Sequence, residues 1–238
     1  MSVAKSIQKQ LETLANDEVA ANAARFFKTG PGEYSESTQF LGIRVPALRQ
    51  LVKSSSSELS LPDAVTLLQS QWHETRLFAL LAMVDQFERG TVSERRAIVN
   101  AYFTYRKVID NWDLVDSSAP YISGEWHFSR DRSRLHKMIT AKSLWDRRIA
   151  MLSTFYYIRQ HDLDDTYRYA EQCLDDPEDL MHKATGWMLR EAGKRDELRL
   201  LNFIDEHATR MPRTMLRYSI EKLSDKKRKQ ILADSRRK

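Results

Sequence analysis

Hydrophobic residues recur at the helical period along most of the 238-residue chain. Between Ser6 and Phe27 they are spaced three or four positions apart, which predicts one amphipathic helix. The apolar positions of this helix are Ile7, Leu11, Leu14, Ala15, Val19 and Ala23. The stretch 29–32, Thr-Gly-Pro-Gly, ends the pattern, and Pro46 is well placed for the first turn of the next helix.

From residue 60 onward the pattern predicts helices joined in pairs. The second helices of successive pairs begin about 30–40 residues apart. Their starts lie near Trp72, Trp112, Trp145, Met181 and Met211. This spacing is typical of an α-solenoid of the HEAT or armadillo kind. We therefore predict an all-α fold, an α-solenoid of HEAT-like repeats that is curved with a concave basic face. It should form a single domain over residues 1–238, with 225–238 as a frayed basic tail.

The composition agrees with a helical protein, because 7 glycines and 6 prolines are too few for many hairpins and turns. The single cysteine, Cys173, excludes an internal disulfide and a cysteine-based metal site, and it is most simply a small buried residue. The six histidines show no ligand spacing, so we expect no metal and no cofactor. The sequence contains neither a leader-like apolar core nor an apolar run of membrane-spanning length. We expect a cytoplasmic protein that does not associate with membranes.

The net charge of +5 is unevenly distributed. Positive residues cluster at 130–137, 147–148, 226–229 and 236–238. A basic face can bind nucleic acid, but charge runs on helices are also often simply solvated. Charge alone leaves both interpretations open.

The stretch Asp110-Asn-Trp-Asp-Leu-Val-Asp116 is the strongest local candidate for chemistry. An Asp-Asn pair is a good helix N-cap, and a helix beginning here would put Trp112 and Asp116 one turn apart on one face. That pair could act on a flat or cationic partner. The alternative is a core tryptophan with Asp116 as a solvated or capping residue. In a solenoid, Trp112, Trp145 and the segment 181–190 would lie side by side on the concave surface. We assign no role to Trp145.

Three ordered segments carry a resemblance to a known family: residues 111–116, 145–148 and 183–192. They resemble the AlkD-like DNA glycosylases, HEAT-repeat proteins that remove alkylated bases from DNA. That family shows Trp-Asp-x-x-Asp, Trp-x-x-Arg and Lys-Ala-x-Gly-Trp-x-Leu-Arg-Glu in this order. The stretch Phe40-Leu-Gly-Ile, followed by Pro46 and Arg49, also looks like the family's early motif.

The resemblance implies the roles of six residues. The catalytic residues it implies are Asp116, Trp112 and Trp187, and the DNA-binding residues are Arg148, Arg190 and Lys183. By itself, Arg148 could instead form an interhelical ion pair with Asp146 or Asp113. Trp72 and Trp126 are expected in the core.

This chain departs from the family's pattern at two places. Asn111 stands where some members have a second aromatic residue, and Phe26 or Phe27 replaces an N-terminal tyrosine. Either change could alter lesion preference or the grip on DNA.

The function that the resemblance implies is a monofunctional DNA glycosylase of base excision repair. It would excise cationic N3- or N7-alkylpurines from duplex DNA as a monomer, with Asp116 stabilising the sugar oxocarbenium and orienting water. The alternative is a non-catalytic HEAT-repeat module that binds damaged or branched DNA, or a protein partner. Asp116 discriminates between the two, because a pure binder gains nothing from a carboxylate that faces phosphates.

Overall fold

The computed structural model describes residues 2–235, which are helical and contain no β-strand. The all-α prediction is therefore confirmed, and the paired helices agree with a solenoid of helical repeats. The chain divides into two compact units, Met1–Ser118 and Ala119–Lys238, and each is described here by itself. The expectation of a single domain stays a prediction.

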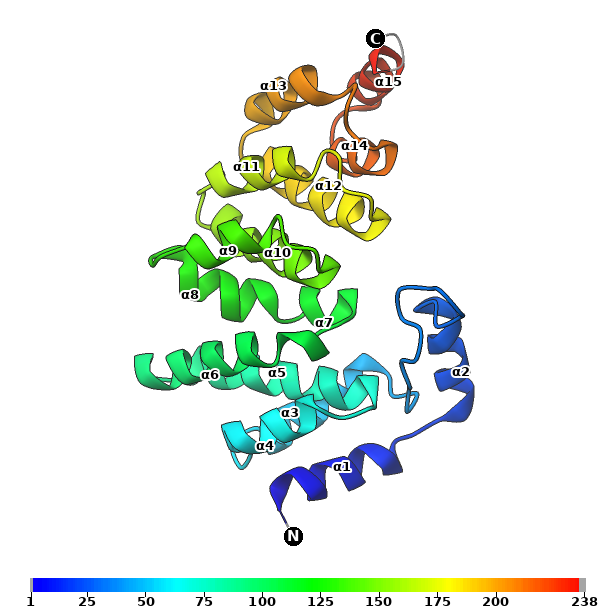
Figure 1. The fold of residues 1–238 in the computed structure, drawn as a ribbon, viewed down its shortest axis with the longest axis vertical. Helices are drawn as coiled ribbons and strands as arrows, with labels where there is room; N and C mark the ends of the chain where they lie inside the picture. Colours follow the sequence, from blue (N-terminus) through cyan, green and yellow to red (C-terminus); the bar gives the residue numbers. More distant parts are fainter. Residues whose placement is uncertain (1, 236–238) are drawn as a thin grey trace. The chain divides into compact units, whose positions relative to one another are not determined.

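The first unit contains seven α-helices and one 3₁₀ turn among the described residues (Figure 1). They are α1 (Val3–Thr13), α2 (Asp17–Phe26), α3 (Val45–Ser55), α4 (Leu61–Leu68), α5 (His73–Arg89), α6 (Val92–Thr104), η1 (Arg106–Val108) and α7 (Trp112–Asp116). Helix α5 is the centre of this unit, because α3, α4, α6 and α7 all pack against it. Its residues are buried almost without interruption from His73 to Met83, as expected for a helix surrounded by others.

The predicted helix between Ser6 and Phe27 is wrong as a single element, because the chain forms α1 and α2 instead. Asn16 has an extended backbone, and its side chain accepts a hydrogen bond from the Val19 amide at 3.0 Å. The Asn16 amide donates to the Leu41 carbonyl at 2.9 Å. An N-cap in the middle of the apolar pattern therefore restarts the helix in a new direction.

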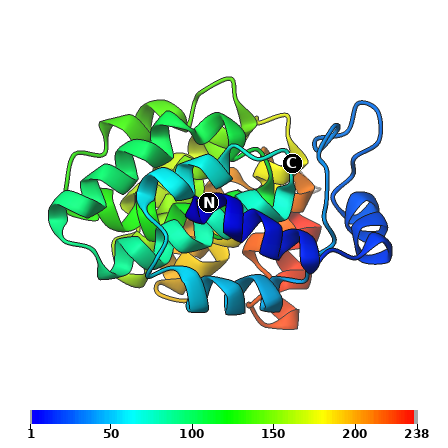
Figure 2. The ribbon, with the colours of Figure 1, turned by 90° about the horizontal axis from the view of Figure 1, so that it is seen from below.

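Helix α2 lies apart from the other helices of the first unit in both ribbon views (Figures 1 and 2). None of its residues is buried, and Phe26 at its last position has 67% of its surface exposed. What joins α2 to the unit is the segment that follows it, which returns toward α5.

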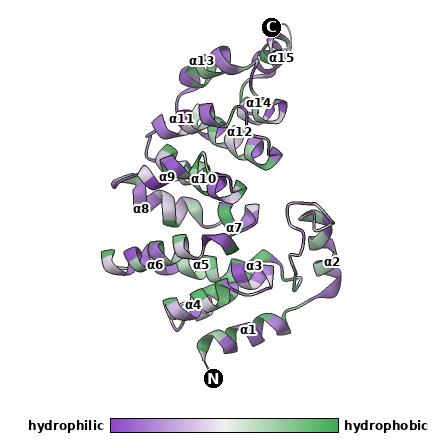
Figure 3. Ribbon diagram, in the orientation of Figure 1, coloured by the Kyte–Doolittle hydropathy of each residue, from purple (hydrophilic) through white to green (hydrophobic). Residues whose placement is uncertain are grey.

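The second unit contains eight α-helices and one π-helical turn among the described residues. Its elements are η2 (Pro120–Gly124, a π-helical turn), α8 (Glu125–Phe128), α9 (Ser133–Met138), α10 (Leu144–Arg159), α11 (Asp164–Gln172), α12 (Asp179–Gly193), α13 (Glu197–His207), α14 (Arg213–Ser219) and α15 (Asp225–Asp234). Helices α10, α12 and α14 pack in succession, and α11 packs against both α10 and α12. Figure 3 shows hydrophobic and hydrophilic residues mixed along the helices of this unit.

A helix occupies Asp225–Asp234, within the segment for which we expected a frayed tail. Ser224 caps it by accepting from the Lys227 amide, and Lys227 pairs with Glu197 of α13. Residues 236–238 of the predicted tail lie outside the described residues.

The starts of the second helices are confirmed. The observed starts are His73, Trp112, Leu144, Asp179 and Arg213, each within two residues of the position that the sequence pattern indicated.

Candidate functional site

Helix α7 begins at Trp112, as the sequence predicts, and Asn111 is its N-cap. The Asn111 side-chain oxygen accepts from the Trp112 amide, and its amide nitrogen donates to Ser35 Oγ, both at 2.8 Å. Asn111 is completely buried. In this chain a small amide occupies the position at which some members of the resembled family have a second aromatic residue. Its bond to Ser35 ties α7 to the segment that follows α2.

Trp112 and Asp116 stand at the two ends of this five-residue helix, and both are half-buried. Residues four apart on a helix share a face, so the ring and the carboxylate are neighbours. The interpretation of Trp112 as a simple core residue does not fit its partial exposure.

The ring of Trp112 belongs to an aromatic cluster that it forms with Phe26, Phe27 and Phe40. Phe27 stacks on Trp112, with 5.3 Å between ring centroids, and Phe26 meets the same ring edge-on at 5.9 Å. Phe40 in turn stacks on Phe27, with 5.2 Å between ring centroids. Both candidate replacements for the family's tyrosine thus contact Trp112, and Phe27 is the one that stacks on it.

The charge of Asp116 lies near the buried hydroxyl of Tyr102, which hydrogen-bonds to Ser118 Oγ at 3.1 Å. Burial raises the pKa of Tyr102 far above its usual value, and the negative charge of Asp116 raises it further. The carboxylate therefore stands where protein partly replaces water on one side. A charge in such surroundings acts more strongly on a cation than it would in bulk water.

The first turn of α5 holds the backbone between α2 and α3 in place, a role that the sequence analysis missed. The buried Glu74 carboxylate accepts three hydrogen bonds, from the amides of Leu41, Gly42 and Ile43, at 2.8–3.2 Å. Gly42 has φ +81°, and a Cβ there would lie 2.0 Å from the Asn16 carbonyl oxygen, so only glycine fits. The early Phe-Leu-Gly-Ile motif is thus a structural connection between α2 and α5.

Arg76, one turn after Trp72, makes a similar connection toward α7. Its guanidinium donates to the Val108 carbonyl at 3.2 Å and pairs with Asp110. Charged residues at the start of an otherwise apolar helix were the signal for these contacts, because a buried charge requires a partner.

In the second unit, Trp187 is half-buried on α12, and its ring lies 5.7 Å from that of Phe155 on α10. Lys183 stands one turn earlier on α12, where its Nζ bonds Asp179 at 2.8 Å while 43% of its side chain is exposed. Both residues are partly exposed. The roles predicted for Trp187 and Lys183 stay predictions.

The two arginines predicted to bind DNA are engaged within the second unit. Arg148 is buried, with 4% of its surface exposed, and its Nη1 donates to the Leu180 carbonyl at 2.6 Å. Arg190 pairs with Glu191 and Glu221, and 18% of its side chain is exposed. A contact between either arginine and phosphate stays a prediction. Arg148 already joins α10 to α12, and Arg190 already joins α12 to Glu221, on the turn after α14.

Two tryptophans expected in the core are only half-buried, so this expectation is wrong. Trp72 is the N-cap residue of α5 rather than a residue within the helix. Trp126 lies under the guanidinium of Arg130, 4.0 Å from the ring centroid, which is a cation–π arrangement at the surface. Cys173 is buried as predicted, and its burial, with the charge of Asp176, raises the pKa of its thiol to about 12.

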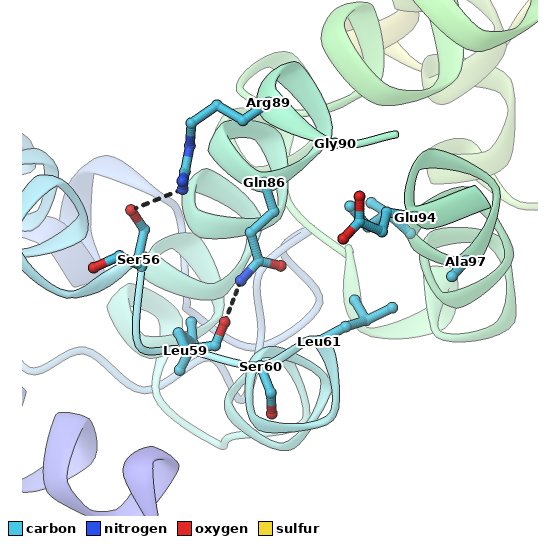
Figure 4. Close-up of a pocket in the computed structure, with 11 residues that line it drawn as sticks. Ser56, Leu59, Ser60, Leu61, Gln86, Arg89, Gly90, Glu94 and Ala97 are labelled. Carbon is cyan, nitrogen blue, oxygen red and sulfur yellow. Dashed lines mark hydrogen bonds between the residues drawn. The ribbon is translucent and has the colours of Figure 1, made fainter. Parts of the chain in front are cut away.

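A pocket of about 460 Å³ lies at the other end of α5, between α4 and α6 (Figure 4). Its polar groups already have partners: Gln86 donates to the Leu59 carbonyl, and Arg89 to Ser56 Oγ. Helix α5 separates the pocket from α7 by roughly 20 Å at the helical rise of 1.5 Å per residue. We do not assign this pocket to the site.

Within residues 2–235, no group of three or more His, Cys, Asp or Glu side chains is arranged to hold a metal ion. Over the same residues, no helix combines the length and apolar character needed to cross a bilayer.

Comparisons with known proteins agree with the resemblance. The structure is similar to a solved structure described as a predicted DNA alkylation repair enzyme from Enterococcus faecalis, with a TM-score of 0.68 and 19% identity. The similarity covers 89% of this chain and 97% of the other, and at this identity it shows a shared fold. A search of curated proteins found no match. The family profile for the DNA alkylation repair enzyme matches residues 7–223, nearly the whole chain. The chain belongs to the DNA alkylation repair enzyme family.

Proposed function

We propose that this protein is a monofunctional DNA glycosylase that excises cationic N3- or N7-alkylpurines from duplex DNA. The proposal starts from the family's role in alkylation repair. One observation carries it further: α7 presents Trp112 and Asp116 on one face, half-buried, next to an aromatic cluster. A carboxylate beside aromatic faces is suited to a developing cation.

The substrate class follows from the residues available. An N3- or N7-alkylated purine already carries a positive charge, so it leaves without a general acid. As the bond from C1′ to the purine nitrogen breaks, its electron pair goes to the purine and neutralises it, and positive charge develops on the sugar. Asp116 stabilises that charge and orients a water molecule, which adds to C1′ and releases one proton. Trp112 provides an aromatic face for the sugar, and Trp187 is the second such face that we propose.

Binding is proposed to depend on the DNA backbone. Lys183 is the most exposed of the three predicted phosphate contacts, whereas Arg148 and Arg190 are mostly covered. The chain carries a net charge of +5, and contacts to phosphate position a protein without reading sequence. We therefore propose duplex binding that is largely independent of sequence.

The experiment is a single-turnover assay for release of 7-methylguanine and 3-methyladenine from alkylated duplex DNA. Asp116→Asn keeps the size of the side chain and removes its charge, and we expect excision to fall by about 10²–10³-fold. The Kd for the duplex should stay constant or improve slightly, because an anion near phosphates is lost. Asp85→Asn is the matched control: it makes the same change in the same unit, at the far end of α5, where Asp85 pairs with Arg89.

Two results would count against the proposal. An Asp116→Asn protein that excises at the wild-type rate removes this residue from the mechanism. A wild-type protein that binds duplex DNA but releases neither base supports the non-catalytic binding module instead.

A further inference from the structure

His73, the first residue of α5, lies beneath the aromatic cluster and is buried, with 1% of its surface exposed. Its Nε2 is 2.7 Å from Asp113 Oδ2 on α7. Its ring centroid is also 5.0 Å from that of Phe27 and 4.8 Å from that of Phe40. One side chain thus contacts both α7 and two rings of the aromatic cluster.

Both carboxylate oxygens of Asp113 have hydrogen-bond partners within the protein. Its Oδ2 faces His73, and its Oδ1 accepts from the Leu114 amide at 2.8 Å. Only 15% of its side chain is exposed. Although it lies between Trp112 and Asp116 in sequence, Asp113 attaches α7 to α5 rather than facing a substrate.

The short length of α7 makes this attachment important. A helix of five residues has almost no stability of its own, so its position depends on its anchors. Two side chains of α5 make such anchors: His73 bonds Asp113 within α7, and Arg76 pairs with Asp110 just before it.

We propose that His73 is a positioning residue for Asp116 and Trp112, acting through its hydrogen bond to Asp113. This inference rests on the proposed glycosylase function for its effect on catalysis, although the placement of α7 can be tested separately. Excision requires the carboxylate and the ring to stand at a fixed distance from the sugar. Displacement by about 1 Å can reduce a rate by about 100-fold.

The two ring nitrogens of His73 differ, and this difference provides the test. Nε2 faces the carboxylate and donates to it, whereas Nδ1 is buried and has no hydrogen-bond partner among the described residues. A glutamine amide nitrogen can occupy the position of Nε2, and an asparagine amide nitrogen can reach only the position of Nδ1. His73→Gln therefore keeps the donor to Asp113, and His73→Asn removes it.

Two measurements are made on the full-length protein. The first is the single-turnover excision rate with the Kd for undamaged duplex. The second is the indole N–H resonance of Trp112, identified by its loss in Trp112→Phe. We expect His73→Asn to slow excision by about 10- to 100-fold and to shift the Trp112 resonance, with the Kd unchanged within about twofold. His73→Gln should restore the rate to within a few-fold of wild type and leave the resonance in place.

His127 provides a mirrored control for loss of a buried histidine bond. It is buried in the second unit, and its Nδ1, not its Nε2, is 2.8 Å from the Ser123 carbonyl oxygen. Here asparagine is the conservative change and glutamine the disruptive one. His127→Gln should lower the Tm without changing the excision rate or the Trp112 resonance.

The inference is overturned if His73→Asn excises at the wild-type rate, or if His73→Asn and His73→Gln are equally slow. If His73→Asn does not fold, Asp113→Ala removes the same bond from the other side and must show the same slowing and the same shift. If the wild type does not excise alkylpurines, the proposed function fails, and the resonance alone decides about His73. A shift in His73→Asn that is absent in His73→Gln then supports its control of α7, and no shift refutes it.

Discussion

Replacement of Gly186 by alanine tests whether the glycine of the third motif is there for packing. Helices α12 and α14 approach each other closely at this residue. A Cβ on Gly186 would lie 2.6 Å from the Met215 carbonyl oxygen and 2.6 Å from Tyr218 Cβ. Both distances are roughly 0.8 Å short of ordinary van der Waals contact.

The change in the free energy of unfolding of Gly186→Ala follows from two opposing effects. Overpacking costs about 1–3 kcal/mol, and the upper end applies because the Met215 oxygen is backbone and cannot rotate away. Alanine has a higher helix propensity than glycine, which returns about 1 kcal/mol. We expect a net loss of about 2 kcal/mol in the free energy of unfolding, and a Tm lower by about 4–8 °C for a chain of this length.

The assay is thermal unfolding followed by circular dichroism, with Gly193→Ala as the matched control on the same helix. There the added Cβ would meet atoms of the Leu200 side chain and no backbone atom, so the loss should be smaller. A Gly186→Ala protein as stable as wild type, or no less stable than Gly193→Ala, would refute the packing explanation.

Three further predictions follow from the described contacts. Cys173, with its pKa raised from 9.0 to about 12 by burial, should resist thiol reagents at pH 8 until the protein unfolds. Because the pKa of the Cys173 thiol is higher in the folded than in the unfolded protein, its protonated form contributes to stability below pH 9.0. This contribution should be lost as the pH rises from 9.0 to about 12, and Cys173→Ala should not show that loss. Glu74→Gln replaces one of the two carboxylate oxygens that accept from backbone amides by an amide nitrogen, which cannot accept. Urea titration should show a loss of about 1–3 kcal/mol in the free energy of unfolding, and an unchanged midpoint would contradict the role of Glu74. Lys183→Ala should reduce the slope of log Kd against log salt for duplex DNA by about 1, and an unchanged slope would remove Lys183 from the phosphate contacts.

The elements predicted correctly are those whose signals are local. The N-cap at Asn111 and the start of α10 after Ser143 both depend on a side chain that bonds the backbone within three residues. Such contacts are fully specified by neighbouring residues. The all-α class follows in the same way from the helical period and from the scarcity of turn residues.

The break between α1 and α2 was missed because two signals compete there. The apolar spacing continues through Leu14 and Ala15, but both are exposed. Asn16 caps a new helix, and its amide bonds Leu41, a partner 25 positions away along the chain. A regular pattern in the sequence does not reveal a backbone partner at that distance.

The catalytic roles named for the candidate site stay predictions, and the residues that support α7 were missed by the sequence analysis. The resemblance points to Trp112 and Asp116, but nothing local connects His73 with Asp113, 40 positions later. The same holds for Glu74 and the three amides that it binds. Long-range polar contacts of this kind depend on the packing of α5 against α7, so they become visible only when the fold is known.

Some motif residues make structural contacts, whereas others have a proposed role in the chemistry. Tests of function have to treat these two groups differently. Gly42 and Gly186 each fill a close approach between backbones, and Arg190 joins α12 to Glu221 on the turn after α14. Loss of activity on changing any of these cannot separate catalysis from folding, because each change removes a structural contact.

Asp116 differs from that group, because it is half-buried and the role that we propose for it depends on its charge. His73 differs in another way, since its two ring nitrogens allow a conservative and a disruptive change at one position. A change of rate in Asp116→Asn at constant Tm, together with rescue of His73 by glutamine but not by asparagine, distinguishes a placed carboxylate from a merely intact fold. A motif match cannot make that distinction.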